Sequence, residues 1–203
     1  MGESSEVYTH GHHPVIMAAH AERTADEAAA FLLPRLEPGM HLLDVGCGPG
    51  SITVGLAGHL GPSGSVIGVD SSEEAVAQAL RNGRDVVGLN FEVASVYNLP
   101  FPDASFDVVF GHQILQHLAD PVVALVEIHR VLKAGGLVAM RDADFGSMSF
   151  YPEAAELHRW LDIYHSVARA NGGEPDAGRR LASWIRSAGF VNTTSTSSTW
   201  TYT

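Results

Sequence analysis

The sequence predicts an α/β fold built on a doubly wound, mostly parallel sheet with helices on both faces. Short apolar runs typical of buried strands alternate with segments that carry helix caps, and this alternation favours parallel strands joined by helical crossovers. The stretch LLDVGCGPGS (42–51) joins the first of these strands to a helix through a turn with three glycines. Asp70 ends the next strand, so an acid is expected at the same edge of the sheet as the glycine turn.

The first part of the chain is expected to form a helix, a strand and a second helix. An Ala-rich segment predicts a helix over about 14–33, which Pro34 ends. The run Met40–Val45 is short and apolar, as in a buried strand. Ser51 follows the glycines as the expected N-cap of a helix that reaches Leu60.

The middle of the chain continues the alternation. Ser71 and Glu74 form a capping box at the start of a helix that is expected to reach about residue 83. Short apolar runs predict three further strands, at Ser65–Val69, Leu89–Val93 and Phe106–Phe110.

The last third begins with a strong helix start. Asp120 followed by Pro121 is an N-cap with proline at the first helical position, and the helix is expected to run to Lys133, where Gly135–Gly136 stops it. The remaining expected elements are a strand at Leu137–Met140, helices near 151–170 and 176–188, and a Thr/Ser-rich last strand at 191–202.

The composition limits the class of protein. The chain has 203 residues and a formal charge of −11, without the Lys and Arg cluster that a nucleic-acid partner would require. Cys47 is its single cysteine, so no intrachain disulfide can form and a cytoplasmic location is expected. The N-terminus lacks the pattern of a signal peptide, and no run of about 18 apolar residues predicts a membrane span.

The glycine turn favours a nucleoside site over a dinucleotide site. Glycines at 46, 48 and 50 allow positive φ or close approach of a ligand, but the third comes one position early for G-x-G-x-x-G. Asp44 would repel a pyrophosphate, whereas it suits an ammonium or sulfonium group. Asp70 is placed to take the hydroxyls of a ribose. Two alternatives stay open: a tight turn without a ligand, and Asp70 as a cap of the next helix.

Four segments resemble the class I S-adenosylmethionine-dependent methyltransferases. They are DVGCGPG (44–50), Asp70, LPFPDASFDVV (99–109) and HRVLKAGG (129–136), in the order of the ubiquinone/menaquinone-biosynthesis-like subgroup, methyltransferase type 11. The resemblance is strong over about 40–145. It implies a Rossmann-like fold and S-adenosyl-L-methionine as the cofactor.

The resemblance also organises the chain as one domain, 1–203. It implies an N-terminal helical lid (1–38), a cofactor-binding core (39–145), and substrate-side helices with the last strand (146–203). The family's final antiparallel strand has no counterpart in this chain. Because the Thr-rich strand 191–202 would leave an open edge, we expect either a longer native protein or a homodimer paired through that strand.

The resemblance assigns most of the cofactor site. In the family an Asp after the third strand binds the adenine amino group. This chain has Ser95 there, which can accept a hydrogen bond but carries no charge. The expected cofactor-binding residues are Asp44, Gly46, Cys47, Gly48, Gly50, Asp70, Ser71, Ser95, Val96, His112 and Gln113.

Methyl transfer from a sulfonium is an in-line displacement that depends mainly on positioning. A base is needed only where the acceptor must lose a proton, and the candidates near the mouth of the site are His112, His117 and Asp144. Structural interpretations stay open for two of them: a buried, hydrogen-bonded His117, and Asp144 as the cap of a turn.

The remaining candidates concern the acceptor. Tyr8, His12, His13 and Phe145 are expected to face the acceptor. The opposite wall is expected from the following helix, which carries Phe150, Tyr151, Trp160 and Tyr164. If these aromatic side chains line the pocket, they would suit an apolar or aromatic small molecule; the alternative is that they pack in the core. The histidines of residues 9–20 lack supporting Cys or carboxylate ligands, so we expect no metal.

Three functions follow in order of preference. The first is methyl transfer from S-adenosylmethionine to a small-molecule acceptor. The second is a methyltransferase-fold module that binds the cofactor without transferring its methyl group. The third is a nicotinamide-dependent oxidoreductase, which the glycine spacing and Asp44 disfavour.

Overall fold

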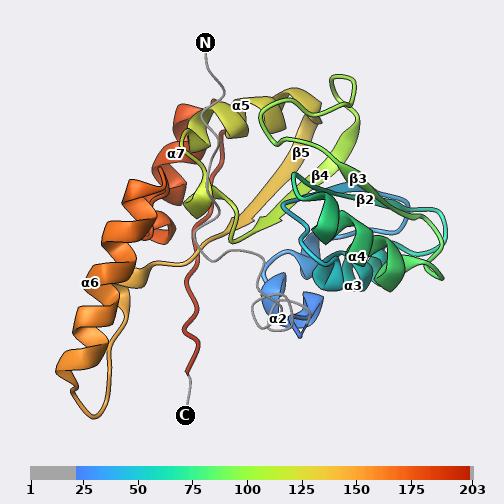
Figure 1. Ribbon diagram of the computed structural model, residues 1–203. Coiled ribbons are helices and arrows are strands. Elements are labelled where there is room, and N and C mark those ends of the chain that lie inside the picture. The colour runs from blue at the N-terminus through green and yellow to red at the C-terminus, as the bar shows by residue number, and fades with distance from the viewer. Residues whose placement is uncertain (1–21, 202–203) are drawn as a thin grey trace.

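The computed structural model describes residues 22–201, which build a five-stranded sheet with helices on both sides (Figure 1). All paired strands are parallel, in the order β3-β2-β1-β4-β5. The strands are β1 (His41–Val45), β2 (Ser65–Asp70), β3 (Leu89–Val93), β4 (Phe106–His112) and β5 (Leu132–Arg141). The helices are α2 (Ala25–Ala28), α3 (Ser51–Leu60), α4 (Glu73–Gly83), α5 (Pro121–Val131), α6 (Ala155–Ala170) and α7 (Leu181–Ser187). Short 3-10 turns are η1 (Leu33–Arg35), η2 (Leu115–His117), η3 (Phe145–Ser147) and η4 (Ala177–Arg180).

The strand order places a crevice at the end of β1. β1 pairs with β2 on one side and with β4 on the other, so Val45 is flanked by Val69 and Gly111. The chain therefore leaves β1 towards one edge of the sheet and returns to build the other edge from β4. At such a reversal the connecting loops diverge, and ligands bind beyond the carboxyl ends of the strands.

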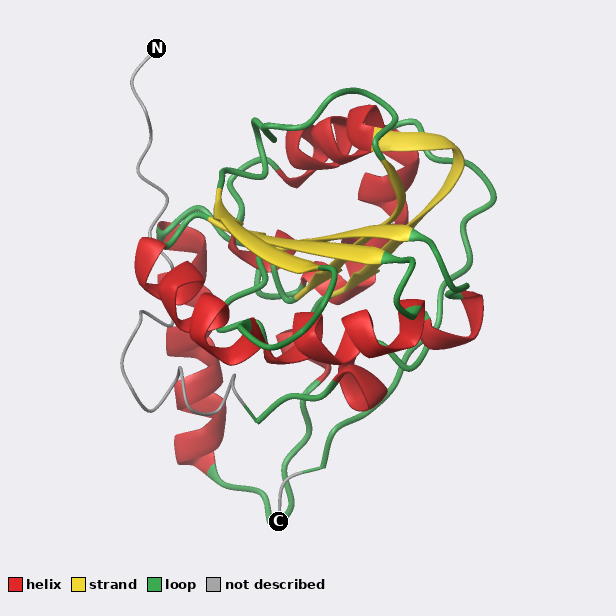
Figure 2. Ribbon diagram, turned by 90° about the vertical axis from the view of Figure 1, so that its right-hand side faces the viewer, coloured by secondary structure: helices red, strands yellow, loops and turns green. Residues whose placement is uncertain are grey.

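Adjacent residues of β1 belong to different hydrophobic clusters, as the alternation of a strand requires. Leu42 packs with Leu56 of α3, on the face that α2 and α3 cover. Leu43 packs with Leu125 of α5, on the face that α5 and α7 cover. Figure 2 shows the sheet between these two layers of helices. The predicted fold class is confirmed, and no helix of residues 22–201 combines the length and apolarity that crossing a bilayer requires.

Two helix starts differ from the prediction by one residue. The N-cap of α3 is Gly50, with a φ of 79°, and Ser51 is already helical. The side chain that caps α4 belongs to Ser72, not Ser71. The later start of α4 has a structural cause. Asp70 accepts a hydrogen bond from the backbone N–H of Ser72, and this contact keeps Ser71 in the turn before the helix.

Other helices are shorter than predicted. Within the described part of the expected helix 14–33, only α2 and η1 are helical. The helix expected to reach Lys133 ends at Val131, because Leu132 already pairs with Phe106 as the first residue of β5. Sheet pairing thus overrides the helix stop expected at the two following glycines. The expected helix 151–170 begins at Ala155, and the helix expected at 176–188 is divided into η4 and α7.

The predicted last strand is wrong for residues 191–201, which form no strand. Side-chain contacts hold part of this segment instead. The Arg141 guanidinium donates a hydrogen bond of 2.7 Å to the Ser198 hydroxyl and lies 4.7 Å from the centre of the Trp200 ring. The homodimer expected to pair through this segment stays a prediction.

Candidate active site

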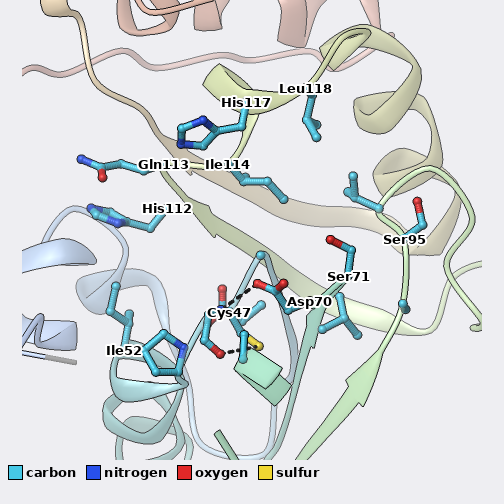
Figure 3. A pocket seen from close by; sticks show the side chains of 18 of the residues that line it. Cys47, Ile52, Asp70, Ser71, Ser95, His112, Gln113, Ile114, His117 and Leu118 are labelled. Carbon is cyan, nitrogen blue, oxygen red and sulfur yellow. Dashed lines mark hydrogen bonds between the residues drawn. The ribbon is translucent and has the colours of Figure 1, made fainter. Parts of the chain in front are cut away.

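A pocket opens beyond the carboxyl ends of β1, β2 and β4, between the glycine turn and the segment that follows β4 (Figure 3). Most of the predicted cofactor and catalytic residues line it: Asp44, Gly46, Cys47, Gly48, Asp70, Ser71, Ser95, Val96, His112, Gln113 and His117. Lining residues that the sequence did not single out include Arg23, Ile52, Tyr97, Ile114 and Leu118. Gly50, Asp144 and Phe145 do not line it, and Tyr8, His12 and His13 lie outside the described residues.

The three glycines of the turn have different reasons to be glycine. All have positive φ, which side chains rarely tolerate. A Cβ on Gly46 would lie 2.8 Å from the Ile114 Cδ1 atom, and one on Gly50 would lie 2.7 Å from the Phe91 Cζ atom. A Cβ on Gly48 would meet nothing within 4 Å. Gly46 and Gly50 therefore fit the protein's own packing, whereas Gly48 leaves open space in which a ligand can approach the backbone.

Asp70 connects the glycine turn to the start of α4. One carboxylate oxygen accepts a hydrogen bond of 2.9 Å from the backbone N–H of Gly48, and the other accepts one of 2.9 Å from the N–H of Ser72. The alternative role as a helix cap is thus partly correct. Each oxygen retains a lone pair, so the same carboxylate can fix the turn and accept a ribose hydroxyl.

Asp44 lies beneath the turn with 2% of its surface exposed. Burial raises the pKa of its carboxyl group to about 7; a hydrogen bond from the Thr53 hydroxyl, at 2.6 Å, opposes this rise, and the charge of Asp70 adds to it. Burial, with the charges of the same two carboxylates, also raises the pKa of the Cys47 thiol, which stays protonated. Two carboxyl groups in one pocket favour a cationic ligand.

The segment after β3 forms the wall where the resemblance places adenine. The Ser95 hydroxyl accepts a hydrogen bond of 3.3 Å from the N–H of Tyr97, and it can still donate one. The neighbouring Val96 is 7% exposed, so its side chain offers an apolar surface. This wall provides packing and one hydroxyl, without the carboxylate of the resembled family.

The segment after β4 forms the opposite wall. His112 is 7% exposed, and its ring centre lies 5.9 Å from that of Trp200. Gln113 has a φ of 56°, in the left-handed region that is uncommon for non-glycine residues, and its N–H donates to the Arg141 carbonyl at 2.7 Å. Unusual backbone geometry at a pocket is typical of functional sites. No local pattern predicts this geometry, because the hydrogen bond joins Gln113 to a residue at the end of the neighbouring strand β5.

The structure directs Asp144 away from the pocket. Its carboxylate oxygens accept hydrogen bonds from the Arg179 guanidinium at 2.8–3.0 Å. The centre of the following Phe145 ring lies 4.3 Å from that of Tyr164, with the two rings tilted by 39°. Asp144 is the N-cap residue of η3, but its side chain makes no capping hydrogen bond, so the expected role as the cap of a turn is wrong and the side chain forms an ion pair instead. Because the Arg179 guanidinium occupies both carboxylate oxygens outside the pocket, Asp144 is not placed to contact an acceptor there.

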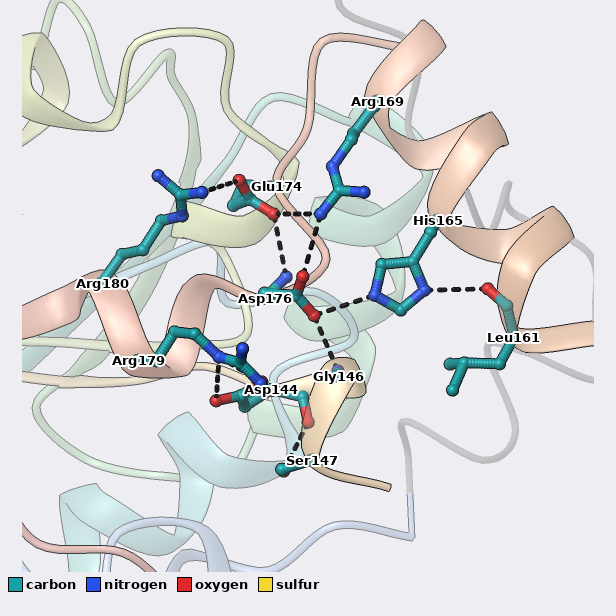
Figure 4. Close-up of polar contacts among 10 residues, drawn as sticks. All are labelled: Asp144, Gly146, Ser147, Leu161, His165, Arg169, Glu174, Asp176, Arg179 and Arg180. Atoms are coloured by element: carbon teal, nitrogen blue, oxygen red, sulfur yellow. Dashed lines mark hydrogen bonds and ion pairs between the residues drawn. The ribbon is translucent and has the colours of Figure 1, made fainter. Parts of the chain in front are cut away.

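A network of charged residues joins η3, α6 and η4 next to Asp144 (Figure 4). Asp176 accepts hydrogen bonds from the N–H of Gly146 at 2.7 Å, from His165 at 2.8 Å and from Arg169 at 2.9 Å. The other ring nitrogen of His165 lies 2.8 Å from the Leu161 carbonyl oxygen. Because both ring nitrogens face acceptors, the contacts favour the doubly protonated imidazolium of His165.

We expect this network to stabilise the fold most at mildly acidic pH. Burial and the charge of Arg169 lower the pKa of His165. The hydrogen bonds to Leu161 and Asp176 and the charge of Asp176 raise it by more, so the net pKa is raised. A raised folded-state pKa contributes stability that is fully present below about pH 6.5 and is lost as the pH rises through the folded value. His165→Gln should therefore lower the free energy of unfolding by about 2 kcal/mol at pH 6 and by less at pH 8.5.

Urea denaturation of both proteins at the two pH values measures this difference. The matched control is His158→Gln on the same helix, because His158 pairs with Glu153 at 2.6 Å in an exposed position. The control should change the free energy of unfolding little at either pH. An equal loss for His165→Gln at pH 6 and pH 8.5 would contradict the imidazolium assignment.

Among residues 22–201, no three potential metal-ligating side chains gather in one place. The N-terminal histidines that the sequence raised as metal candidates precede this range, so the structure does not bear on them.

Comparisons with known proteins identify the family of this chain. A sequence family described as a methyltransferase domain matches residues 36–189. An uncharacterized methyltransferase of Schizosaccharomyces pombe is 41% identical over 96% of this chain and 73% of its own length. A demethylmenaquinone methyltransferase of Lactococcus lactis is 33% identical over 75% of this chain and 66% of its own length. This chain spans as little as 50% of another curated relative.

A solved structure supports the same family. The S-adenosylmethionine-dependent methyltransferase from Mesorhizobium loti superposes with a TM-score of 0.54 at 27% identity, over 64% of this chain and 58% of the other. The predicted resemblance is confirmed by these matches. The chain belongs to the methyltransferase-domain family and has the Rossmann-like fold of the S-adenosylmethionine-dependent methyltransferases.

Proposed function

We propose that this protein transfers the methyl group of S-adenosylmethionine to a small-molecule acceptor. The observation that carries the proposal is the open space over Gly48 beside the Asp70 carboxylate, in a pocket with a second buried carboxyl group, Asp44. When bound, the cofactor supplies a methyl group already activated by the positive sulfur. Asp44 would face the amino group of its methionine part, and Asp70 would accept hydrogen bonds from its ribose.

The residues after β3 and β4 complete the proposed site. Ser95 and Val96 would contact the adenine, with Ser71 next to the ribose. His112 and Gln113 would border the methyl group and His117 the acceptor. Ile114 and Leu118 add apolar surface to the same wall, which favours an apolar or aromatic acceptor.

The division of the chain remains part of this proposal. Residues 1–38 would cover the cofactor, with Tyr8, His12 and His13 facing the acceptor. Arg23 lines the pocket, which supports this role, although Ala25 and Leu32 pack into the core beside α3. The formal charge of −11 and the single cysteine support a cytoplasmic enzyme that does not bind nucleic acid.

Two measurements test the function. Calorimetric titration with S-adenosylmethionine, S-adenosylhomocysteine and NADH should give binding for the first two ligands alone. Incubation of the protein with methyl-labelled cofactor and a metabolite extract should then transfer label to a small molecule, and heat-denatured protein should transfer none. Binding without transfer to any extract would favour the inactive cofactor-binding module, and binding of NADH alone would reject the methyltransferase assignment.

A further inference from the structure

Gln116 is a buried polar residue next to the pocket-lining His117. It is 2% exposed, and both its backbone N–H and its backbone carbonyl are hydrogen-bonded. Its N–H donates to the Asp142 carboxylate at 2.9 Å, and its carbonyl accepts from the N–H of Glu174 at 2.9 Å. Burial and these two backbone hydrogen bonds hold the residue in place, so its side chain has little freedom to reorient.

The side-chain amide of Gln116 has a defined orientation. Its oxygen lies 3.1 Å from the backbone N–H of Ala143, which can only donate, so the amide oxygen must be at that position. Its NH₂ group is then the atom 3.0 Å from the Nε2 atom of His117. An amide NH₂ has no lone pair to offer, so it donates and the His117 Nε2 atom accepts.

The hydrogen bond from Gln116 selects one tautomer of the neutral His117 ring. A ring nitrogen that accepts a hydrogen bond carries no proton, so in the neutral ring the proton is on Nδ1. Protonating Nε2 would direct its hydrogen at the NH₂ group of Gln116 and remove the contact. The structure also holds the segment rigidly, because the Asp142 carboxylate accepts from the backbone N–H groups of Leu115 and Gln116 at the start of η2.

We propose that Gln116 is a positioning residue that keeps His117 as the neutral Nδ1–H tautomer, so that His117 acts on the acceptor as a hydrogen-bond donor and not as a base. This inference rests on the proposed methyl transfer and specifies its acceptor. A donor at this place orients an acceptor oxygen that has no proton to lose, as in a phenolate or an enolate. In this tautomer His117 could not accept the proton of an alcohol, so an alcohol would not be deprotonated by this residue.

The tautomer can be measured without substrate. In ¹⁵N-histidine-labelled protein, two-bond ¹H–¹⁵N correlations distinguish a protonated ring nitrogen from one that accepts, and His117→Asn identifies the His117 signals. We expect Nδ1 to be protonated and Nε2 to accept in the wild-type protein. A protonated Nε2 at neutral pH would overturn the proposal, whether or not the protein transfers methyl groups.

A matched pair of variants tests the cause. Gln116→Glu keeps an oxygen for Ala143 but replaces the NH₂ group with an acceptor, so the proton of His117 should move to Nε2. The control is Gln78→Glu on α4, where Gln78 bonds to Asn82 and Arg81 on the surface; it adds the same charge and should leave the tautomer unchanged. An unchanged tautomer in Gln116→Glu would contradict the role of Gln116.

Substitutions of His117 test the donor role in the reaction. The amide nitrogen of Asn can occupy the place of Nδ1, whereas that of Gln occupies the place of Nε2. We expect His117→Asn to retain at least ~10 times the kcat of His117→Gln, with little change in KM for S-adenosylmethionine in either. General base catalysis contributes about 10²–10⁴-fold, so equal losses of that size in both variants would show that His117 is a base and overturn the proposal.

Discussion

Asp70→Ala should weaken the binding of S-adenosylhomocysteine by at least ~100-fold, the largest effect that we expect from a single substitution in the pocket. Hydrogen bonds to a charged group contribute about 1.5–3 kcal/mol each, and two ribose hydroxyls would lose theirs together. The substitution also removes the acceptor that holds Gly48 and Ser72, so the turn itself should loosen. Isothermal titration calorimetry measures the affinity.

A pair of ligands separates the ribose contact from the loosened turn. Wild-type protein should bind adenosine more tightly than 2′,3′-dideoxyadenosine, and Asp70→Ala should bind both equally, because the difference reports the hydroxyl contact alone. Asp85→Ala is the control, since Asp85 is exposed and pairs with Arg84. An unchanged affinity of Asp70→Ala for S-adenosylhomocysteine would show that Asp70 does not bind the ribose.

The affinity for S-adenosylhomocysteine should rise about fivefold between pH 6 and pH 7, and a proton should be released on binding. The group responsible is Asp44. Burial raises the pKa of its carboxyl group to about 7, so much of the free protein carries a proton there at neutral pH. A bound ammonium group favours the ionised form and expels that proton. Calorimetry in buffers of different ionisation enthalpy counts the protons released.

Asp44→Asn tests this coupling. We expect the substitution to weaken ligand binding but to stabilise the fold of the free protein. The variant should bind S-adenosylhomocysteine more weakly, and its affinity should vary little over this pH range. A carboxyl group with a raised folded-state pKa destabilises the fold as the pH rises from about 4 to about 7. The variant without ligand should therefore unfold at a higher temperature than the wild type at pH 8. The same pH dependence of binding in both proteins would assign the proton to another group.

The carboxylates differ in how far the sequence could specify their roles. The sequence placed Asp44 and Asp70 at the ends of neighbouring strands, and the structure brings both to the pocket. Asp144 was chosen for the same reason, at the end of β5, but it turns outward to Arg179. Asp142, two residues earlier, is the acid that faces inward and holds η2. Strand alternation does not extend into a loop, so the sequence could not decide between these two acids.

The sequence by itself determined the order of strands and helices, the glycine turn, and the acid at the end of β2. These features follow from local rules: apolar runs, glycine at positive φ, and capping residues. The start of β5 and the missing last strand follow from sheet pairing, which depends on segments far apart in the chain.

Only the tertiary structure decided the chemical state of the site. Gln116 is one polar residue in the apolar stretch HQILQHL, and nothing local shows that the N–H of Ala143 orients its amide. The burial that raises the pKa of Asp44 likewise arises when the turn and α3 close over it. Hydrogen-bond direction and desolvation depend on neighbours in space, and these neighbours come together only when the chain has folded.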